Sequence, residues 1–213
     1  MLHDLFEEER RHVTLGPGAA LLGGFVRDIA DDLIHHIHEL SALTPFRHME
    51  TPGGKRMSVA MLSCGHLGWI TDRTGYRYTD FDPLTGKAWP AFPALFLDLA
   101  RRAAQEVGFR NFVPDACLIN RYQPGARMSL HQDMDERDLT APIVSVSLGL
   151  PAIFLWGGLH RTVRPRRYQV LHGDVVVWGD ASRMIFHGVD VLKNGQHPAT
   201  GDIRFNLTFR KVN

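Results

Sequence analysis

The sequence predicts a mainly β domain with supporting α-helices, and three observations lead to that class. The chain has 213 residues, of which 44% are hydrophobic and 22% charged, as in one globular domain with a full core. Two helical patterns lie in its first half. From Pro114 onward, short strand-like runs alternate with turn residues. Many short strands after helices indicate a β-barrel or sandwich with helices packed outside.

The first helical pattern is DIADDLIHHIHELSAL, residues 28–43. Its apolar residues recur near helical spacing: Ile29, Leu33, Ile37 and Leu40. Asp28 is the predicted N-cap, and Pro45 is predicted to stop the helix. The second pattern, PALFLDLARRAAQEVGF (93–109), has Gly108 as its predicted stop. Its apolar face comprises Leu95, Leu99 and Ala103.

The predicted strands fall into two groups. Residues 46–90 hold short segments broken by glycine and proline turns. The longer runs after Pro114 are DACLINRYQPG, PIVSVSLGLPAIFLW, RYQVLHGDVVVWGD, RMIFHGVDVL and DIRFNLTFRKV. No internal repeat or low-complexity linker divides the chain, so residues 1–213 are expected to form one domain.

Composition limits the function classes. A formal net charge of +1 means that any nucleic-acid footprint must be local. Two cysteines, Cys64 and Cys117, make no disulfide framework, so a cytoplasmic location is expected. The charged N-terminus MLHDLFEEERRH lacks a signal-peptide pattern, and no run of about twenty apolar residues predicts a membrane span. We therefore expect no membrane partner.

The run SLHQDMDE, residues 129–136, contains the candidate metal ligands. His131 and Asp133 are two residues apart, so on an extended segment they point the same way. His187, where the apolar run RMIFHGV ends in His-Gly, is the candidate third ligand. Two histidines and one carboxylate leave three open positions, as in non-haem Fe(II) sites. The chain has 12 histidines, however, so a chance His-x-Asp pair is the alternative.

The C-terminal run RFNLTFR, residues 204–210, alternates strictly. Its polar face comprises Arg204, Asn206, Thr208 and Arg210. One interpretation is a half-exposed strand with a solvated polar face. The other is an anion cradle inside a barrel, because buried arginines must be paired with an anion. Asn120 and Tyr122 could add donors to that anion, or they simply flank the turn that follows.

Together the runs INRYQPG, SLHQDMDE, PIVSVSLGLPAIF, HGDVVVWGD, FHG and RFNLTFR resemble the bacterial AlkB family of iron- and 2-oxoglutarate-dependent nucleic-acid demethylases. The likeness extends from about residue 51 to Arg210. It implies a double-stranded β-helix, or jelly roll, with an N-terminal nucleotide-recognition lid. The implied divisions are 1–45 (extension and helix), 46–90 (lid) and 91–213 (supporting helix and catalytic core).

The resemblance also implies a role for each matching residue. The Fe(II) ligands would be His131, Asp133 and His187. Arg204, with Asn120 and Tyr122, would bind the far carboxylate of 2-oxoglutarate, and Asn206 and Arg210 the carboxylate beside its keto group. With O2, such an enzyme hydroxylates the methyl group of 1-methyladenine or 3-methylcytosine in DNA, with RNA as a second candidate, and releases formaldehyde.

The implied nucleic-acid contacts lie mainly in residues 46–90. Trp69 would stack on the base, and Asp135 would favour a cationic methylated base. The implied backbone contacts are Thr51, Tyr76, Arg77, Tyr78 and Arg161. The alternatives are a core tryptophan at Trp69, a solvated turn at Asp135 and Glu136, and a solvated loop at HRTVRPRR (160–167).

Three residues depart from the family pattern: Lys55, Arg56 and Met134. They leave the expected reaction intact but put strand preference and lesion range in doubt. Three other functions compete with the demethylase. They are a 2-oxoglutarate oxygenase acting on a protein or small molecule, a non-enzymatic jelly-roll binding module, and a zinc hydrolase, which would give Arg204 and Arg210 no role. A monomer is expected.

Overall fold

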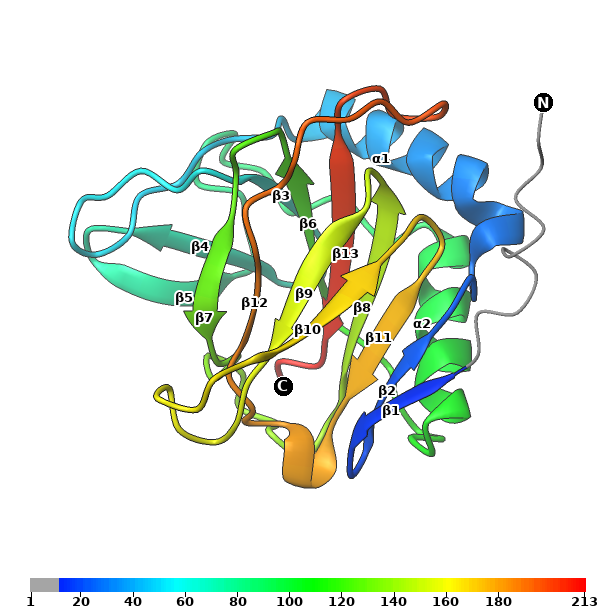
Figure 1. Cartoon of the computed structure of the whole chain (residues 1–213). Helices are drawn as coiled ribbons and strands as arrows, with labels where there is room; N and C mark the ends of the chain where they lie inside the picture. The colour runs from blue at the N-terminus through cyan, green and yellow to red at the C-terminus, as the bar shows by residue number, and fades with distance from the viewer. Residues whose placement is uncertain (1–11) are drawn as a thin grey trace.

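The computed structural model describes residues 12–213, and its strands form two facing antiparallel sheets with helices on one side (Figure 1). The predictions for the first eleven residues lie outside the described part. The larger sheet has the order β1-β2-β11-β8-β13-β6-β3 and the smaller one β10-β9-β12-β7. This is a jelly-roll core, and the predicted fold class is confirmed.

The large sheet contains seven strands. They are β1 (Val13–Gly16), β2 (Ala19–Leu22), β3 (Ala60–Gly65), β6 (Ala116–Tyr122), β8 (Ile143–Gly149), β11 (Val175–Trp178) and β13 (Arg204–Arg210). The small sheet contains four: β7 (Met128–His131), β9 (Ala152–Trp156), β10 (Arg166–Val170) and β12 (His187–Val189). A separate hairpin joins β4 (Gly68–Asp72) to β5 (Gly75–Thr79). Single-turn 3-10 helices cover Arg27–Ile29 and Asp180–Ser182.

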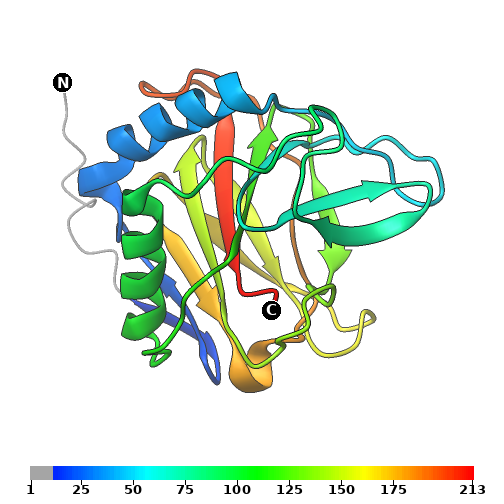
Figure 2. The ribbon, with the colours of Figure 1, turned by 180° about the vertical axis from the view of Figure 1, so that it is seen from behind.

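The two α-helices cover the outer face of the large sheet (Figure 2). Helix α1 spans Ala30–Leu43, and its buried face includes Leu33 and Ile37. It ends where Thr44 turns extended before Pro45, because a proline disfavours helical geometry in the preceding residue. Asp28 is not the N-cap, and that prediction is wrong: it lies within the 3-10 turn that leads into α1.

Helix α2 spans Ala94–Glu106 and buries Leu99 and Ala103 against the same sheet. Gly108, two residues beyond it, has a φ of +100°, a conformation that favours glycine. The predicted stop is therefore confirmed. Within residues 12–213, neither helix is long and apolar enough to cross a membrane.

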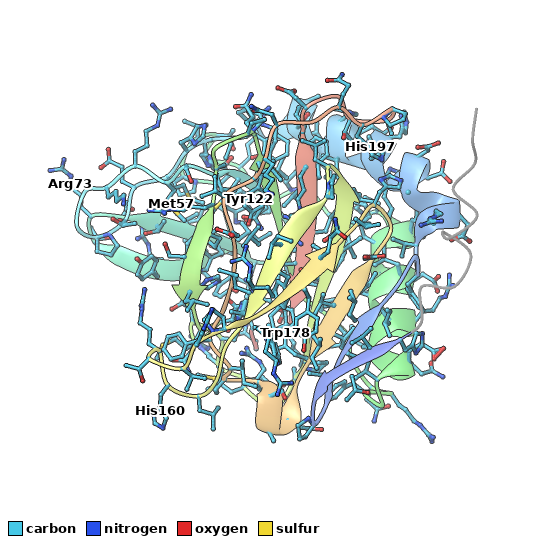
Figure 3. All side chains as sticks on the ribbon, in the orientation of Figure 1. Met57, Arg73, Tyr122, His160, Trp178 and His197 are labelled. Carbon is cyan, nitrogen blue, oxygen red and sulfur yellow. The ribbon has the colours of Figure 1, made fainter. Side chains whose placement is uncertain are left out.

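Strand β13 runs through the middle of the large sheet, between β8 and β6. Its apolar side chains, such as Leu207 and Phe209, pack against the helices. Its polar side chains point into the space between the two sheets and are also buried. The alternative of a solvated polar face is therefore wrong, and the interior of the jelly roll is polar at its centre. Tyr122 and Trp178 occupy this interior (Figure 3).

The β4–β5 hairpin projects beyond the edge of the core (Figures 1 and 2). Trp89 attaches it: the indole Nε1 donates to the carbonyl oxygen of Thr79 at 2.9 Å, and Gly68 lies directly against the ring. A Cβ at position 68 would stand 2.2 Å from the ring, so only glycine permits this approach. The hairpin belongs to the predicted lid, whose boundaries at residues 46 and 90 stay predictions.

Replacing Gly68 with alanine is expected to displace the hairpin and to destabilise the protein by about 1–3 kcal/mol, the usual effect of overpacking. Urea denaturation would measure the loss. The exposed Gly86→Ala is a matched control, because a Cβ there meets nothing within 4 Å, although its φ of +69° adds some strain. Equal stability of Gly68→Ala and wild type would contradict the contact.

Candidate active site

Three side chains meet between the small sheet and the segment after β7. His131 ends β7 and pairs directly with His187, the first residue of β12. Asp133 follows His131 by two residues. Their candidate ligand atoms all lie within 4.8 Å of one another. His131 Nε2 is 3.6 Å from Asp133 Oδ1, and His187 Nε2 is 3.9 Å from Asp133 Oδ2.

Backbone carbonyls orient both imidazoles. His131 Nδ1 donates to the oxygen of Ser129 at 2.8 Å, and His187 Nδ1 donates to that of Ile185 at 3.0 Å. Each bond holds the proton on Nδ1 and leaves the Nε2 lone pair for a metal. Burial, followed by the neighbouring His131, lowers the pKa of His187 to about 4, so this ring is neutral at pH 7. The cluster therefore fits an octahedral metal ion with open positions.

Asp133 is buried and remains ionised. Burial alone would raise its pKa, but Arg210 and the two histidines together hold that pKa well below its usual range. Arg210 donates to Asp133 Oδ2 from Nε at 3.0 Å and from Nη2 at 2.8 Å. Arg210 thus orients the carboxylate ligand. Its proposed contact with the carboxylate beside the keto group of 2-oxoglutarate stays a prediction.

Arg204, deeper in the same space, has a guanidinium that is largely without partners. The residue is 2% exposed; Nη2 donates to Ser147 Oγ at 2.9 Å, and the group lies 4.9 Å from the centre of the Tyr122 ring. Within residues 12–213, Nε and Nη1 have no hydrogen-bond partner. Burial lowers the pKa of Arg204, which Tyr122 opposes. A buried cation with free donors fits the carboxylate of an acidic cosubstrate.

The two polar residues beside Arg204 lie on facing positions of β6 and β13. Asn120 pairs with Asn206 in the sheet, and Asn120 Nδ2 donates to Asn206 Oδ1 at 3.3 Å. Asn206 Nδ2 in turn donates to Ser145 Oγ at 2.8 Å. Asn120 Oδ1 has no partner within residues 12–213. A ligand donor could therefore bind there.

One cavity of about 810 Å³ joins these groups to the hairpin. It is lined by all the predicted metal and 2-oxoglutarate residues: His131, Asp133, His187, Asn120, Tyr122, Arg204, Asn206 and Arg210. Of the predicted nucleic-acid residues it is lined by Thr51, Trp69, Tyr76, Asp135 and Arg161. Arg77 and Tyr78 are not among its lining residues.

At the hairpin end of the cavity, Trp69 is half-buried: it packs against the core and also lines the cavity. Its Nε1 donates to Asp135 Oδ2 at 2.8 Å, and its ring stacks on that of Tyr76 with centroids 5.7 Å apart. The arrangement places an aromatic face and a carboxylate side by side at the cavity.

The two remaining hairpin residues, Arg77 and Tyr78, are bound to other side chains. Arg77 donates to both carboxylate oxygens of Asp72, at 3.0 and 2.7 Å, and lowers the Asp72 pKa. Tyr78 donates to Glu136 Oε1 at 2.6 Å, and burial raises the pKa of Tyr78, so the hydroxyl stays protonated. Their proposed contacts with a nucleotide backbone stay predictions.

Basic side chains lie around the hairpin end of the cavity. Lys55, Arg56 and Arg127 line it and are exposed, as is Met134 at 61%. Arg161 lies 5.9 Å from the centre of the Phe186 ring. Within HRTVRPRR, Arg167 forms an ion pair with Asp190 and is not free. Figure 3 shows Arg73 and His160 projecting outward from the hairpin and from this loop.

Sequence reasoning missed Arg183 and did not place Glu136. Arg183, 2% exposed, donates to Glu136 Oε2 at 3.0 Å and to the backbone oxygen of Asp133 at 2.5 Å. Glu136 is 6% exposed, so the solvated-turn alternative is wrong for it. Arg and Glu are almost never fully buried unless paired, and the sequence shows no pairing signal for either.

Comparisons with known proteins agree with this geometry. The model of the 2OG-Fe(II) oxygenase superfamily matches residues 18–210. The chain is 56% identical to the alpha-ketoglutarate-dependent dioxygenase AlkB of Escherichia coli K12, over 98% of this chain and 97% of that one. It is 31% identical to the DNA N(6)-methyladenine demethylase ALKBH1D of Arabidopsis thaliana, over 96% of this chain and 51% of that one. The solved structure of OsALKBH1 superposes with a TM-score of 0.79 at 31% identity, covering 94% of this chain and 100% of that one.

Proposed function

The chain belongs to the AlkB family of the 2OG-Fe(II) oxygenase superfamily, and on that premise we propose that it oxidatively demethylates alkylated bases in nucleic acid. It is an Fe(II)- and 2-oxoglutarate-dependent dioxygenase. One observation carries the proposal: a single cavity joins the His131–Asp133–His187 cluster to the half-buried Trp69 and its carboxylate partner. A relative named as a nucleic-acid demethylase supports the same substrate class.

At the metal end of the cavity, each residue has a separate role. When bound, Fe(II), 2-oxoglutarate and O2 supply an oxidant that hydroxylates a C–H bond, while 2-oxoglutarate becomes succinate and carbon dioxide. The histidine Nε2 atoms and Asp133 would hold the ion, and Arg210 holds Asp133 in place. Arg204 would bind the distal carboxylate of 2-oxoglutarate with Nε and Nη1, which have no partner within residues 12–213. A hydroxymethyl group on a ring nitrogen then leaves as formaldehyde.

The hairpin end of the cavity suits a flat, cationic base. Adenine methylated at N1 and cytosine methylated at N3 carry positive charge at neutral pH. Trp69 offers its indole face, where a cation gains about 0.5–2 kcal/mol, and Asp135 offers a carboxylate beside it. The target base must leave its stack to reach the metal, and methylation on its pairing edge lowers the cost of flipping.

The nucleotide backbone is proposed to lie along the basic edge of the cavity. Tyr76, Thr51 and Arg161 line it and would contact the phosphates. Arg77 and Tyr78 would contact the backbone only after giving up their bonds to Asp72 and Glu136. The monomeric state and the cytoplasmic location stay predictions from the sequence.

The direct test uses a single-stranded oligonucleotide that carries one 1-methyladenine. It is incubated with the protein, Fe(II), 2-oxoglutarate and O2, and mass spectrometry follows the loss of one methyl group. His131→Ala, and reactions that lack one component each, are the controls. Loss of the methyl group only in the complete wild-type reaction supports the proposal. An intact oligonucleotide with succinate still formed would favour the alternative, an oxygenase acting on a protein or small molecule.

Replacing Asp135 with asparagine is expected to weaken the preference for cationic bases about tenfold or more. A hydrogen bond to a charged group contributes about 1.5–3 kcal/mol more than water does, and asparagine keeps the shape but not the charge. Competition between 1-methyladenine and the neutral N6-methyladenine would measure it. Asp138→Asn is the matched control, because Asp138 does not line the cavity. An unchanged ranking would remove the proposed role of Asp135.

A further inference from the structure

Glu136 joins the hairpin to the core through a buried polar network. Its Oε1 accepts a hydrogen bond from the hydroxyl of Tyr78 on β5 at 2.6 Å. Its Oε2 accepts one from Arg183 Nη2 at 3.0 Å, and Oε1 lies 3.4 Å from Arg210 Nε. Three segments far apart in the sequence therefore meet on one carboxylate.

The network continues to the metal-ligand residue Asp133 by two routes. Arg210 donates to its carboxylate oxygen Oδ2, and Arg183 donates to its backbone oxygen. One guanidinium thus fixes the ligand atom and the other fixes the main chain that bears it. Glu136 contacts both guanidiniums. A shift of Glu136 would therefore move both the carboxylate and the main chain of Asp133.

The hairpin end of this network is also the proposed base-binding platform. Tyr78 is the direct cross-strand partner of Trp69, and such pairs project from the same face of a sheet. Trp69 donates to Asp135 while Tyr78 donates to the neighbouring Glu136. Two consecutive carboxylates, one exposed and one buried, therefore hold two facing aromatic side chains.

The bond from Tyr78 is the one link that can be removed without leaving a buried charge uncompensated. Asp133, Glu136, Arg183 and Arg210 are two carboxylates and two guanidiniums, each at most 7% exposed. Removing one charged member leaves its partners as uncompensated buried charges, which usually destabilises the folded state by several kcal/mol. Tyr78 is neutral, so its loss frees the hairpin while the ion pairs around Asp133 remain.

We propose that Tyr78 and Glu136 are positioning residues that couple the placement of the β4–β5 hairpin to the orientation of Asp133. A base that stacks on Trp69 fixes the position of the hairpin. The contacts from Tyr78 through Glu136 to Arg210 transmit that position to the carboxylate of Asp133. The substrate side rests on the proposed demethylase function. The coupling itself does not, because linkage is reciprocal: metal binding at Asp133 must also steady the hairpin without any nucleic acid.

The first test uses the metal alone. Amide hydrogen exchange over residues 68–79 is measured in wild type and in Tyr78→Phe, without and with Co(II) as the probe ion. In wild type, Co(II) is expected to slow hairpin exchange on the order of fivefold or more, the usual lower range for coupled sites. In Tyr78→Phe that effect of the metal is expected to disappear.

A purely structural role for Tyr78 would speed hairpin exchange equally with and without Co(II), and that result would overturn the proposal. So would the absence of a metal effect in wild type. Tyr76→Phe is the matched control, because it removes a hydroxyl from the same strand that makes no bond to Glu136; it should keep the metal effect. Glu136→Gln retains an acceptor for Tyr78 but loses the charge between Arg183 and Arg210, so the metal effect should weaken.

The second test adds the methylated oligonucleotide, Fe(II) and 2-oxoglutarate. The ratio of succinate formed to methyl groups removed is expected to rise severalfold in Tyr78→Phe. The reason is that the bound base no longer controls the orientation of Asp133. A ratio equal to that of wild type would contradict the substrate side of the coupling. If the wild type leaves the oligonucleotide intact, the demethylase proposal fails, while the Co(II) exchange result still decides the coupling.

Discussion

His187→Ala is expected to lose all measurable turnover. His187 supplies one of three ligand atoms, and its ring is neutral and already oriented by Ile185. Loss of a group that merely supports a ligand lowers metal affinity about 10- to 100-fold, so loss of the ligand itself should lower it by more than about 100-fold. Titration with Co(II), read by its absorption, measures the affinity, and succinate formation measures turnover.

The control for this variant is His197→Ala. His197 is also partly buried, but its ring lies against that of His172, tilted by 31° with centroids 4.4 Å apart, and it does not line the cavity. Its replacement should leave Co(II) affinity close to that of wild type. Full metal binding and turnover in His187→Ala would show that the cluster is not the metal centre.

Arg204→Met is expected to have two opposite effects. The requirement for 2-oxoglutarate should rise about 30-fold to several thousand-fold, because removing one partner of a buried charge pair costs about 2–5 kcal/mol. The ligand-free protein should be at least as stable as wild type, because a buried guanidinium with two unpaired donors is replaced by an apolar side chain of similar length.

Two measurements check this pair of effects: the KM for 2-oxoglutarate and the Tm of the ligand-free protein. Arg121→Met serves as the control, because Arg121 lies on the neighbouring strand β6 and stacks on Phe46 at 4.7 Å outside the cavity. A large fall in Tm with an unchanged KM would show that Arg204 supports the fold and does not bind the cosubstrate.

The alternation of residues 204–210 predicted the faces of β13 correctly, because side chains of a strand have a period of two. What the pattern alone left open was whether the polar face met water. That depends on β8 and β6 flanking the strand and on the small sheet facing it, which are contacts between distant segments. The same holds for His187, whose place opposite His131 comes from strand pairing.

Local signals failed where structure depends on distant partners. The bond between Glu136 and Tyr78 spans 58 residues and that between Glu136 and Arg183 spans 47, so no local pattern marks either residue as buried. Strands β1 and β2 were not predicted, since four-residue segments such as VTLG carry too little periodicity. They form because β11 offers a free edge for pairing.

The buried charges around the cavity affect how the metal ion and 2-oxoglutarate bind. Two guanidiniums, from Arg204 and Arg210, and two carboxylates, from Asp133 and Glu136, are the buried charged groups that line the cavity, so their formal charges cancel. A divalent metal ion alone would add two positive charges to this balance, and a dicarboxylate alone would add two negative charges. Bound together they leave the interior charge as it was. The metal ion and the dicarboxylate should therefore each bind more tightly when the other is bound. Protein with only one of the two bound should be a minor species.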